Sequence, residues 1–175
     1  VQSTSPGAYS WIGGGSAHTI YNDFSSIGGG FKNTTSGYTN FIGGGGFNLT
    51  DEPYSSIQSG FGNRAIREFS LIGNGIGNYN IGNFGTILNG SFNTGYSAYT
   101  TVINGAGHYV KGDFGLIGNG LSNLNIGNFG AILNGSFNTG YSHYSTVING
   151  ANHHVEGKFS LIGNGLNNKV YNDYA

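Results

Sequence analysis

Hydrophobic and polar positions recur along this chain with a period of fifteen residues. Each repeat has an aliphatic residue at one position, a glycine three residues later, and Asn or His three residues after that glycine. An aromatic residue precedes the aliphatic one by three positions in every repeat except the one that holds Thr39. A period this regular indicates one short structural unit repeated about eleven times. The aliphatic positions are Ile12, Ile27, Ile42, Ile57, Ile72, Ile87, Val102, Ile117, Ile132, Val147 and Ile162.

This spacing favours short strands over helices. No stripe with a 3.6-residue period is present, and a glycine in every helical turn would cost about 1 kcal/mol each. Units with two strands of three to five residues, joined by glycine corners, can instead form coils that stack about 4.8 Å apart. We therefore predict an all-β fold, a parallel β-solenoid (β-roll) with about eleven 15-residue coils, spanning residues 1–175 as a single repeat domain.

Stacked coils place each residue above its counterpart fifteen positions away, and we call such a set of positions a column. The aliphatic column should form a dry interior, and the glycine column should form corners that need positive φ or a close approach of two backbones. The Asn column should form a ladder of side-chain amides that bond to the corners. His18, His108 and His153 stand in this column, and we expect them to replace Asn in the ladder.

Each coil divides into two similar halves, as in segments 153–157 and 160–165, where a small polar residue is followed by an aliphatic residue and then glycine. This pattern resembles the β-roll repeats of two families. The head domains of trimeric autotransporter adhesins have units of the form Ser-x-aliphatic-x-Gly, and grass antifreeze proteins are built on Asn-x-Val-x-Gly. The resemblance implies a left-handed roll. The chain departs from both families in its aromatic column and in a second Asn column that runs from Asn74 to Asn164.

A longer period of 45 residues, equal to three coils, is superimposed on the first. Residues 81–120 recur almost unchanged at 126–165. We interpret this period as a duplication of three coils and favour that interpretation over a match to a repeating ligand, because repeat arrays grow in this way.

Composition narrows the class of partner. The chain has 35 glycines among 175 residues, 24 Phe and Tyr residues and a net charge of -1, which differs from the low-aromatic, highly charged composition of disordered segments. Six Lys and Arg residues are spread singly, so we expect no nucleic-acid partner. No apolar run approaches the roughly twenty residues of a membrane-spanning helix, so we expect no transmembrane segment. The chain has no Cys and no Met, which suits an extracellular or cell-surface location.

Catalytic and metal-binding patterns are missing from the sequence. The carboxylates lie in different coils, apart from Asp51 and Glu52 next to Pro53. The neighbours His153 and His154 should point to opposite sides of a strand, which does not suit a shared metal. The recurring Gly-Asn-Gly lacks the Lys-Ser or Lys-Thr of a phosphate-binding loop. We expect a non-enzymatic protein with no cofactor.

The residues on either side of the aliphatic column should point outward and compensate for each other in size. Where the first is large, as in Leu71, the second is glycine, as in Gly73; where the first is small, as in Thr86, the second is large, as in Leu88. A second outward column contains several Tyr and Ile residues. So many exposed apolar groups favour burial against another surface. The residues expected to mediate self-association are Trp11, Phe41, Leu71, Leu88, Ile103, Leu116, Leu133, Ile148 and Leu161, with Tyr96 and Tyr141 from the second column.

Three functions fit these patterns. The first is a structural protein that associates laterally with copies of itself, and also head to tail, into an extracellular fibre, sheath or surface layer. Head-to-tail stacking is expected because residues 170–174 repeat the pattern of 20–24, although a fragment of a longer protein would show the same ends. The alternative is an adhesin or fibre head that binds a surface receptor or glycan as a trimer. The second alternative is an ice-binding protein, which the mixed Leu, Ile, Tyr, Lys and Glu residues of the outer columns favour least.

Overall fold

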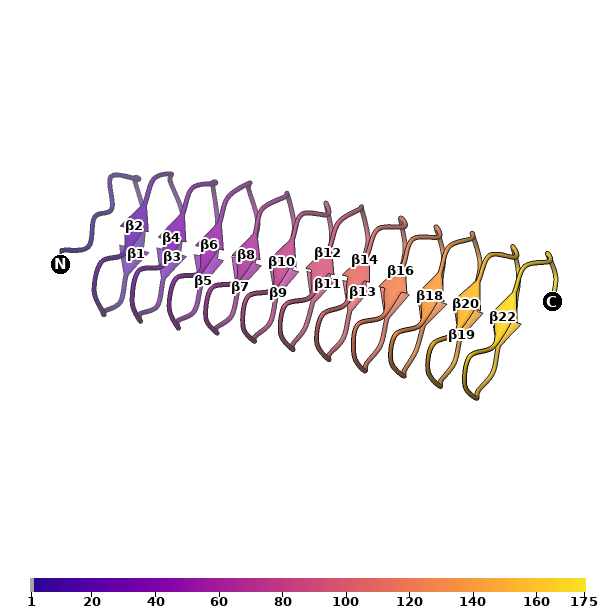
Figure 1. Cartoon of the computed structure of the whole chain (residues 1–175). Helices are drawn as coiled ribbons and strands as arrows, with labels where there is room; N and C mark the ends of the chain where they lie inside the picture. Colours follow the sequence, from indigo (N-terminus) through magenta and orange to yellow (C-terminus); the bar gives the residue numbers. More distant parts are fainter. Residues whose placement is uncertain (1) are drawn as a thin grey trace.

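A computed structural model describes residues 2–175; Val1, the first residue of the predicted domain, lies outside the described residues. The chain winds into a row of coils, and its two ends lie at opposite ends of the resulting rod (Figure 1). Each coil contributes one strand to each of two parallel sheets with eleven strands. The predicted all-β fold and the β-solenoid of about eleven coils are confirmed.

Every strand pairs in parallel with the strand of the next coil, exactly one repeat away in sequence, as in Ile72 with Ile87. The first sheet contains β1 (Trp11–Ile12), β3 (Ser26–Ile27), β5 (Phe41–Ile42), β7 (Ser56–Ile57), β9 (Leu71–Ile72), β11 (Thr86–Ile87), β13 (Thr101–Val102), β15 (Leu116–Ile117), β17 (Ala131–Ile132), β19 (Thr146–Val147) and β21 (Leu161–Ile162). The second contains β2 (Thr19–Ile20), β4 (Thr34–Thr35), β6 (Leu49–Thr50), β8 (Arg64–Ala65), β10 (Tyr79–Asn80), β12 (Thr94–Gly95), β14 (Tyr109–Val110), β16 (Leu124–Asn125), β18 (Thr139–Gly140), β20 (His154–Val155) and β22 (Lys169–Val170). Like residues therefore lie above like residues along the whole rod.

The strands have two residues each, so the predicted length of three to five was wrong. The chain bends soon after each inward-pointing residue, and the corners take up most of the coil. Hydrogen bonds between coils nevertheless continue beyond the strands: the Leu88 amide donates to the Val102 carbonyl at 2.9 Å, and Ser91 forms an isolated parallel bridge with Ala106. The corners thus add to the cohesion between coils.

The glycine column forms a corner that only glycine suits. Its members have φ between 83° and 120°, a region that residues with a Cβ rarely adopt. A Cβ added to Gly90 would also lie 2.1 Å from the carbonyl oxygen of Gly105 in the next coil. Both parts of the expectation for this column, positive φ and close backbone approach, are confirmed.

The aliphatic column forms the interior, and its members from Ile27 to Ile162 are buried. The facing column of the second sheet is more varied and includes the buried Asn80. Glycines make room for that side chain, because a Cβ at Gly85 would lie 2.3 Å from the Asn80 Oδ1 and one at Gly95 would lie 3.2 Å from it. The same set returns 45 residues later with Asn125, so the longer period also repeats a packing arrangement in the core.

Candidate functional site

An exposed strip of large aliphatic side chains follows the outer side of the first sheet. Five of these side chains are between 42% and 52% exposed, and the other two are half-buried. Trp11 and Phe41 continue the same outer side into the first coils, with 59% and 37% of their surface exposed. The outward orientation expected from the sequence is therefore observed. We define the apolar strip as Leu71, Leu88, Ile103, Leu116, Leu133, Ile148 and Leu161.

Beside each large side chain of the apolar strip lies a small residue, and we call the position of that small residue a notch. A Cβ at Gly73 or Gly118 would meet the backbone of the following coil first, at 2.3 Å in both cases, and no atom of the large side chain in the same coil is closer. In the first coil the arrangement differs, because the Trp11 ring itself covers Gly13 at 2.4 Å from such a Cβ. Gly73 and Gly118 of the apolar strip thus lie against the backbone of the next coil, whereas Gly13 lies under a side chain of its own coil.

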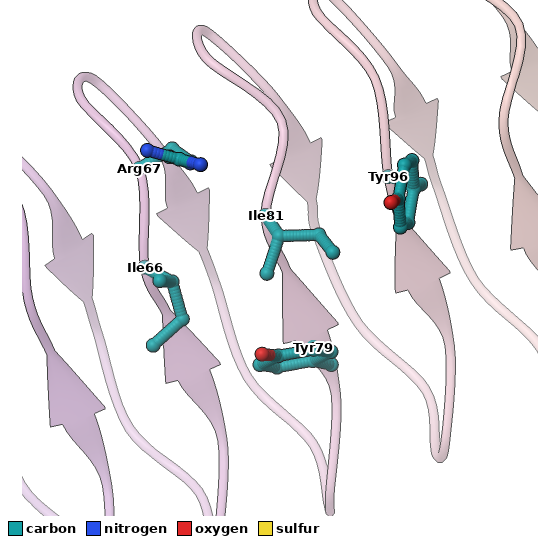
Figure 2. A pocket seen from close by; sticks show the side chains of 5 residues that line it. All are labelled: Ile66, Arg67, Tyr79, Ile81 and Tyr96. Carbon is teal, nitrogen blue, oxygen red and sulfur yellow. The ribbon is translucent and has the colours of Figure 1, made fainter.

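The second sheet presents the other outward column, in which Tyr96 and Tyr141 are about half exposed at 47% and 45%. A shallow pocket of about 280 Å³ opens on this side between neighbouring coils. Figure 2 shows the side chains of Ile66, Ile81 and Tyr79 arranged along it, with Tyr96 on the adjacent coil. Arg67 completes the lining.

Arg67 gives this pocket a positive group on the same coil as Ile66, while the phenol rings of Tyr79 and Tyr96 lie on the two following coils (Figure 2). The Arg67 Nη1 lies 3.3 Å from the Glu52 Oε1, and both side chains are well exposed. An exposed ion pair of this kind contributes little to stability, so the guanidinium remains able to bond to other groups. Together the lining residues offer apolar ring faces, hydroxyl groups and one cation.

The aromatic column forms a continuous stack along one corner of the rod. Neighbouring rings from Tyr54 to Tyr174 have centroids 4.6 to 5.3 Å apart and planes within 7° of each other. These residues are exposed, and each has φ between 54° and 60°. The sequence showed the column but not this conformation, since bulky residues rarely adopt positive φ.

A further corner carries large apolar side chains that sequence reasoning missed. In most coils one of two consecutive residues at this corner is large, as in Phe61 before Gly62 and in Phe92 after Ser91. Phe61 is 54% exposed and Phe92 is 69% exposed. The same exchange of large and small residues that marked the apolar strip could have indicated this corner from the sequence.

The buried Asn column forms the predicted ladder. Asn93 is representative: its Nδ2 donates to the carbonyl of Gly105 at 3.0 Å and to that of Asn89 at 3.4 Å, and its Oδ1 accepts the His108 amide at 2.9 Å. Each ladder residue thus ties its own coil to the next. His18, His108 and His153 replace Asn as expected: their Nδ1 atoms accept the amides of Asn33, Asn123 and Asn168 at 3.1 to 3.2 Å.

The three ladder histidines differ from Asn at the outer nitrogen. Because Nδ1 accepts a backbone amide, Nε2 must carry the proton, and in all three residues this buried atom lacks a well-oriented hydrogen-bond partner. Burial lowers the pKa of His108 below 6.5, and the nearby carbonyl groups of Asn104 and Gly120 offset part of that shift. His108 is therefore a neutral structural residue at pH 7.

The residues with reactive side chains remain dispersed. His154 Nε2 lies 2.8 Å from Glu156 Oε1, but both belong to one exposed strand end and no third ligand joins them. Within residues 2–175, no group of three or more His, Asp or Glu side chains is placed to hold a metal ion. This described part of the chain also contains no helix that is long and apolar enough to span a membrane.

Neither the family models nor the curated proteins searched include a match to this chain.

Proposed function

We propose that this chain is a non-enzymatic structural protein, located outside the cell or at its surface, that associates laterally with copies of itself into a fibre, sheath or surface layer. The observation that carries the proposal is the apolar strip, which places one large aliphatic side chain on the outer face of seven consecutive coils. Soluble monomers rarely expose contiguous apolar surface on this scale, whereas protein interfaces bury it.

The length and charge of the strip also suit association. Six coil spacings of about 4.8 Å make it about 29 Å long. The strip contains no charged residue, and the chain as a whole has a net charge of only -1, so two copies repel each other weakly. Removal of these side chains from water is then the dominant favourable contribution to association.

The mass of the protein, measured by sedimentation over roughly a hundredfold range of concentration, tests this proposal. We expect species larger than the monomer, in a proportion that rises with concentration. Replacement of Leu88, Ile103, Leu133 and Ile148 by Ser should return the protein to a monomer while the far-ultraviolet circular dichroism stays unchanged, because these side chains lie outside the core.

A matched control removes four apolar side chains from another surface. Replacement of Phe61, Phe92, Leu121 and Phe137 by Ser, at the corner described above, removes groups that are exposed to the same degree or more. This variant should associate as the unmodified chain does. A monomer at every concentration, or equal effects of the two variants, would contradict a specific role for the apolar strip.

The pocket on the second sheet favours a second candidate function, an adhesin or fibre head that binds a surface glycan or receptor as a trimer. Tyr79 and Tyr96 offer ring faces for the apolar side of a sugar, and Arg67 offers hydrogen-bond donors to its hydroxyl groups. A glycan array tests this function: Tyr79→Ala and Tyr96→Ala should each abolish any signal of the unmodified protein. A protein that binds no glycan on the array, or a signal unaffected by these substitutions, argues against it.

A further inference from the structure

The apolar strip alternates its large side chains between two columns in a fixed order. The large residue precedes the buried aliphatic residue in one coil and follows it in the next two coils, and this order then repeats. Leu71, Leu116 and Leu161 occupy the first column, and Leu88, Ile103, Leu133 and Ile148 occupy the second. The order has the same 45-residue period as the chain itself. Every coil of the strip therefore has one large side chain and one notch, side by side.

We propose that two copies of this chain pack face to face through the apolar strip, parallel and in register, about a two-fold axis that runs along the rods. This inference rests on the lateral self-association proposed above. Such an axis lies over the buried aliphatic column and exchanges the two columns that flank it. The first column of one copy then faces the second column of the other, coil by coil. Leu116 of each copy lies over Gly118 of its partner, and Ile103 lies over Thr101.

Other face-to-face arrangements leave large side chains opposed to each other. In an antiparallel pair each column faces itself. The second column has four large residues and three small ones over the seven coils, so large residues of that column must oppose each other and an antiparallel pair cannot match all seven coils. A parallel pair shifted by one or two coils also brings large side chains together. A shift of three coils restores the match but leaves three coils of each strip uncovered.

At the glycine notches the nearest atoms belong to the backbone of the next coil. The three atoms nearest to a Cβ at Gly73 or Gly118 are backbone atoms of that coil, the first at 2.3 Å, so neither position has room for a side chain of its own and the partner's side chain would lie over backbone. The notch at Thr101 holds a half-buried Thr, in a column where the following coil carries Leu116. In contrast, Trp11 covers its own glycine, which confines the matched surface to the seven coils of the strip.

A substitution that fills a notch tests the fit separately from hydrophobicity. Thr101→Leu makes the strip more apolar but places a large side chain where the partner's Ile103 should enter. We expect it to weaken association at least tenfold. Thr94→Leu adds the same group to the second sheet, in a column that already contains Leu49 and Leu124, and should leave association unchanged. Tighter association of the Thr101→Leu variant would overturn the proposed fit.

Spin labels determine the direction of the two copies, and the absence of native Cys allows single labels. Asp51→Cys, Lys111→Cys and Glu156→Cys each place a label on the exposed outer side of the second sheet, in one column. The measurement is a pulsed dipolar distance at the lowest concentration at which association begins. A parallel, in-register pair gives the same distance for all three labels, and sedimentation gives the mass of a dimer.

Each other result contradicts the proposal in a distinct way. In an antiparallel pair the distance between identical labels changes with their position along the rod, so three labels in one column cannot all agree. A trimer removes the two-fold axis, and a growing polymer at the same concentration indicates the shift of three coils. A monomer at every concentration overturns the proposed function as well, whereas a dimer with unequal distances overturns only the parallel arrangement.

Discussion

The rings of Phe84 and Tyr99 stack one coil apart, with centroids 5.0 Å apart, planes 3° apart and a φ of 56° at both residues. A left-handed conformation costs an L-residue about 1–2 kcal/mol. Each ring in the stack contacts two neighbours, and an aromatic pair contributes about 0.5–1.5 kcal/mol beyond the burial of area. Stacking along the corner thus offsets the conformational cost of the backbone that places the rings there.

Two substitutions at Phe84 separate these opposing contributions. Phe84→Ala removes two ring contacts but keeps the strained φ, and we expect a loss of about 1–3 kcal/mol in the free energy of unfolding. Phe84→Gly also loses the ring contacts but relieves the strain, so it should be more stable than Phe84→Ala by about 1 kcal/mol. Urea denaturation measures both. A glycine variant less stable than the alanine variant would show that the φ value carries no such cost.

From the histidines already present in the Asn ladder we predict that its other positions tolerate His as well. Asn93→His should leave stability within about 1 kcal/mol, because His108 already accepts a backbone amide through Nδ1 in the same column. Asn93→Ala removes a buried acceptor and a donor together, leaves the His108 amide without a partner, and leaves the Gly105 carbonyl with the Ser91 amide alone. We expect it to cost about 2–4 kcal/mol. Thermal and urea unfolding of the two variants test this order, and equal losses would count against the ladder as a source of stability.

From the lowered pKa of His108 we predict that the protein loses stability in acid. The unfolded chain binds a proton at this residue with a pKa of about 6.5, and burial lowers the pKa in the folded chain. The unfolded state therefore binds more protons between these two values, so the contribution is fully present above about pH 7 and is lost as the pH falls. One such group changes the free energy of unfolding by at most about 1.4 kcal/mol per pH unit.

The variant His108→Asn isolates this contribution. Asn keeps the bond to the Asn123 amide and adds donors toward the carbonyls that the His Nε2 does not reach in good geometry. We expect this variant to be about 1 kcal/mol more stable at pH 7 and to lose less stability in acid. Urea denaturation at several values between about pH 5 and pH 8 measures the difference. Parallel curves for the two proteins would exclude His108 as the source of acid sensitivity.

The period of fifteen was sufficient to predict the coil, the aliphatic interior and the Asn ladder, because each depends only on like residues lying above like residues. Features that depend on the path of the backbone within one coil were not predictable in this way. The short strands and the left-handed conformation of the aromatic column belong to this class. Local preferences argue against positive φ for a residue such as Phe84, and only the stacking of neighbouring coils reverses that preference.

The packing of side chains across the interior also could not be predicted from the columns alone. Asn80 lies in a column of mainly small or aliphatic residues, and its place in the core depends on Gly95, the next member of that column, and on Gly85, which stands in another column and another part of the coil. The outward orientation of the apolar strip was predicted because its two columns flank a single buried residue. The binding of a second copy by that strip is still a prediction.

Gly90 and Gly44 stand in adjacent columns of the same corner, in different coils, and substitutions at these two glycines test how closely neighbouring coils approach each other. Gly90→Ala places a Cβ 2.1 Å from the Gly105 carbonyl oxygen, at a residue whose φ is 106°. The next coil cannot move away without breaking the hydrogen bond from Ser91 to Gly105, so we expect a loss of about 2–4 kcal/mol in the free energy of unfolding.

Gly44 serves as the control for this substitution. A Cβ at Gly44 meets no atom within 4 Å, and other coils have Asn in that column. Gly44→Ala should therefore be neutral or stabilise the fold by up to about 1 kcal/mol, because it restricts the unfolded chain. Urea denaturation of the two variants measures the difference; an unchanged stability of Gly90→Ala would mean that the corner has room for a Cβ, and a similar loss in both would mean that the close contact at Gly90 is not its cause.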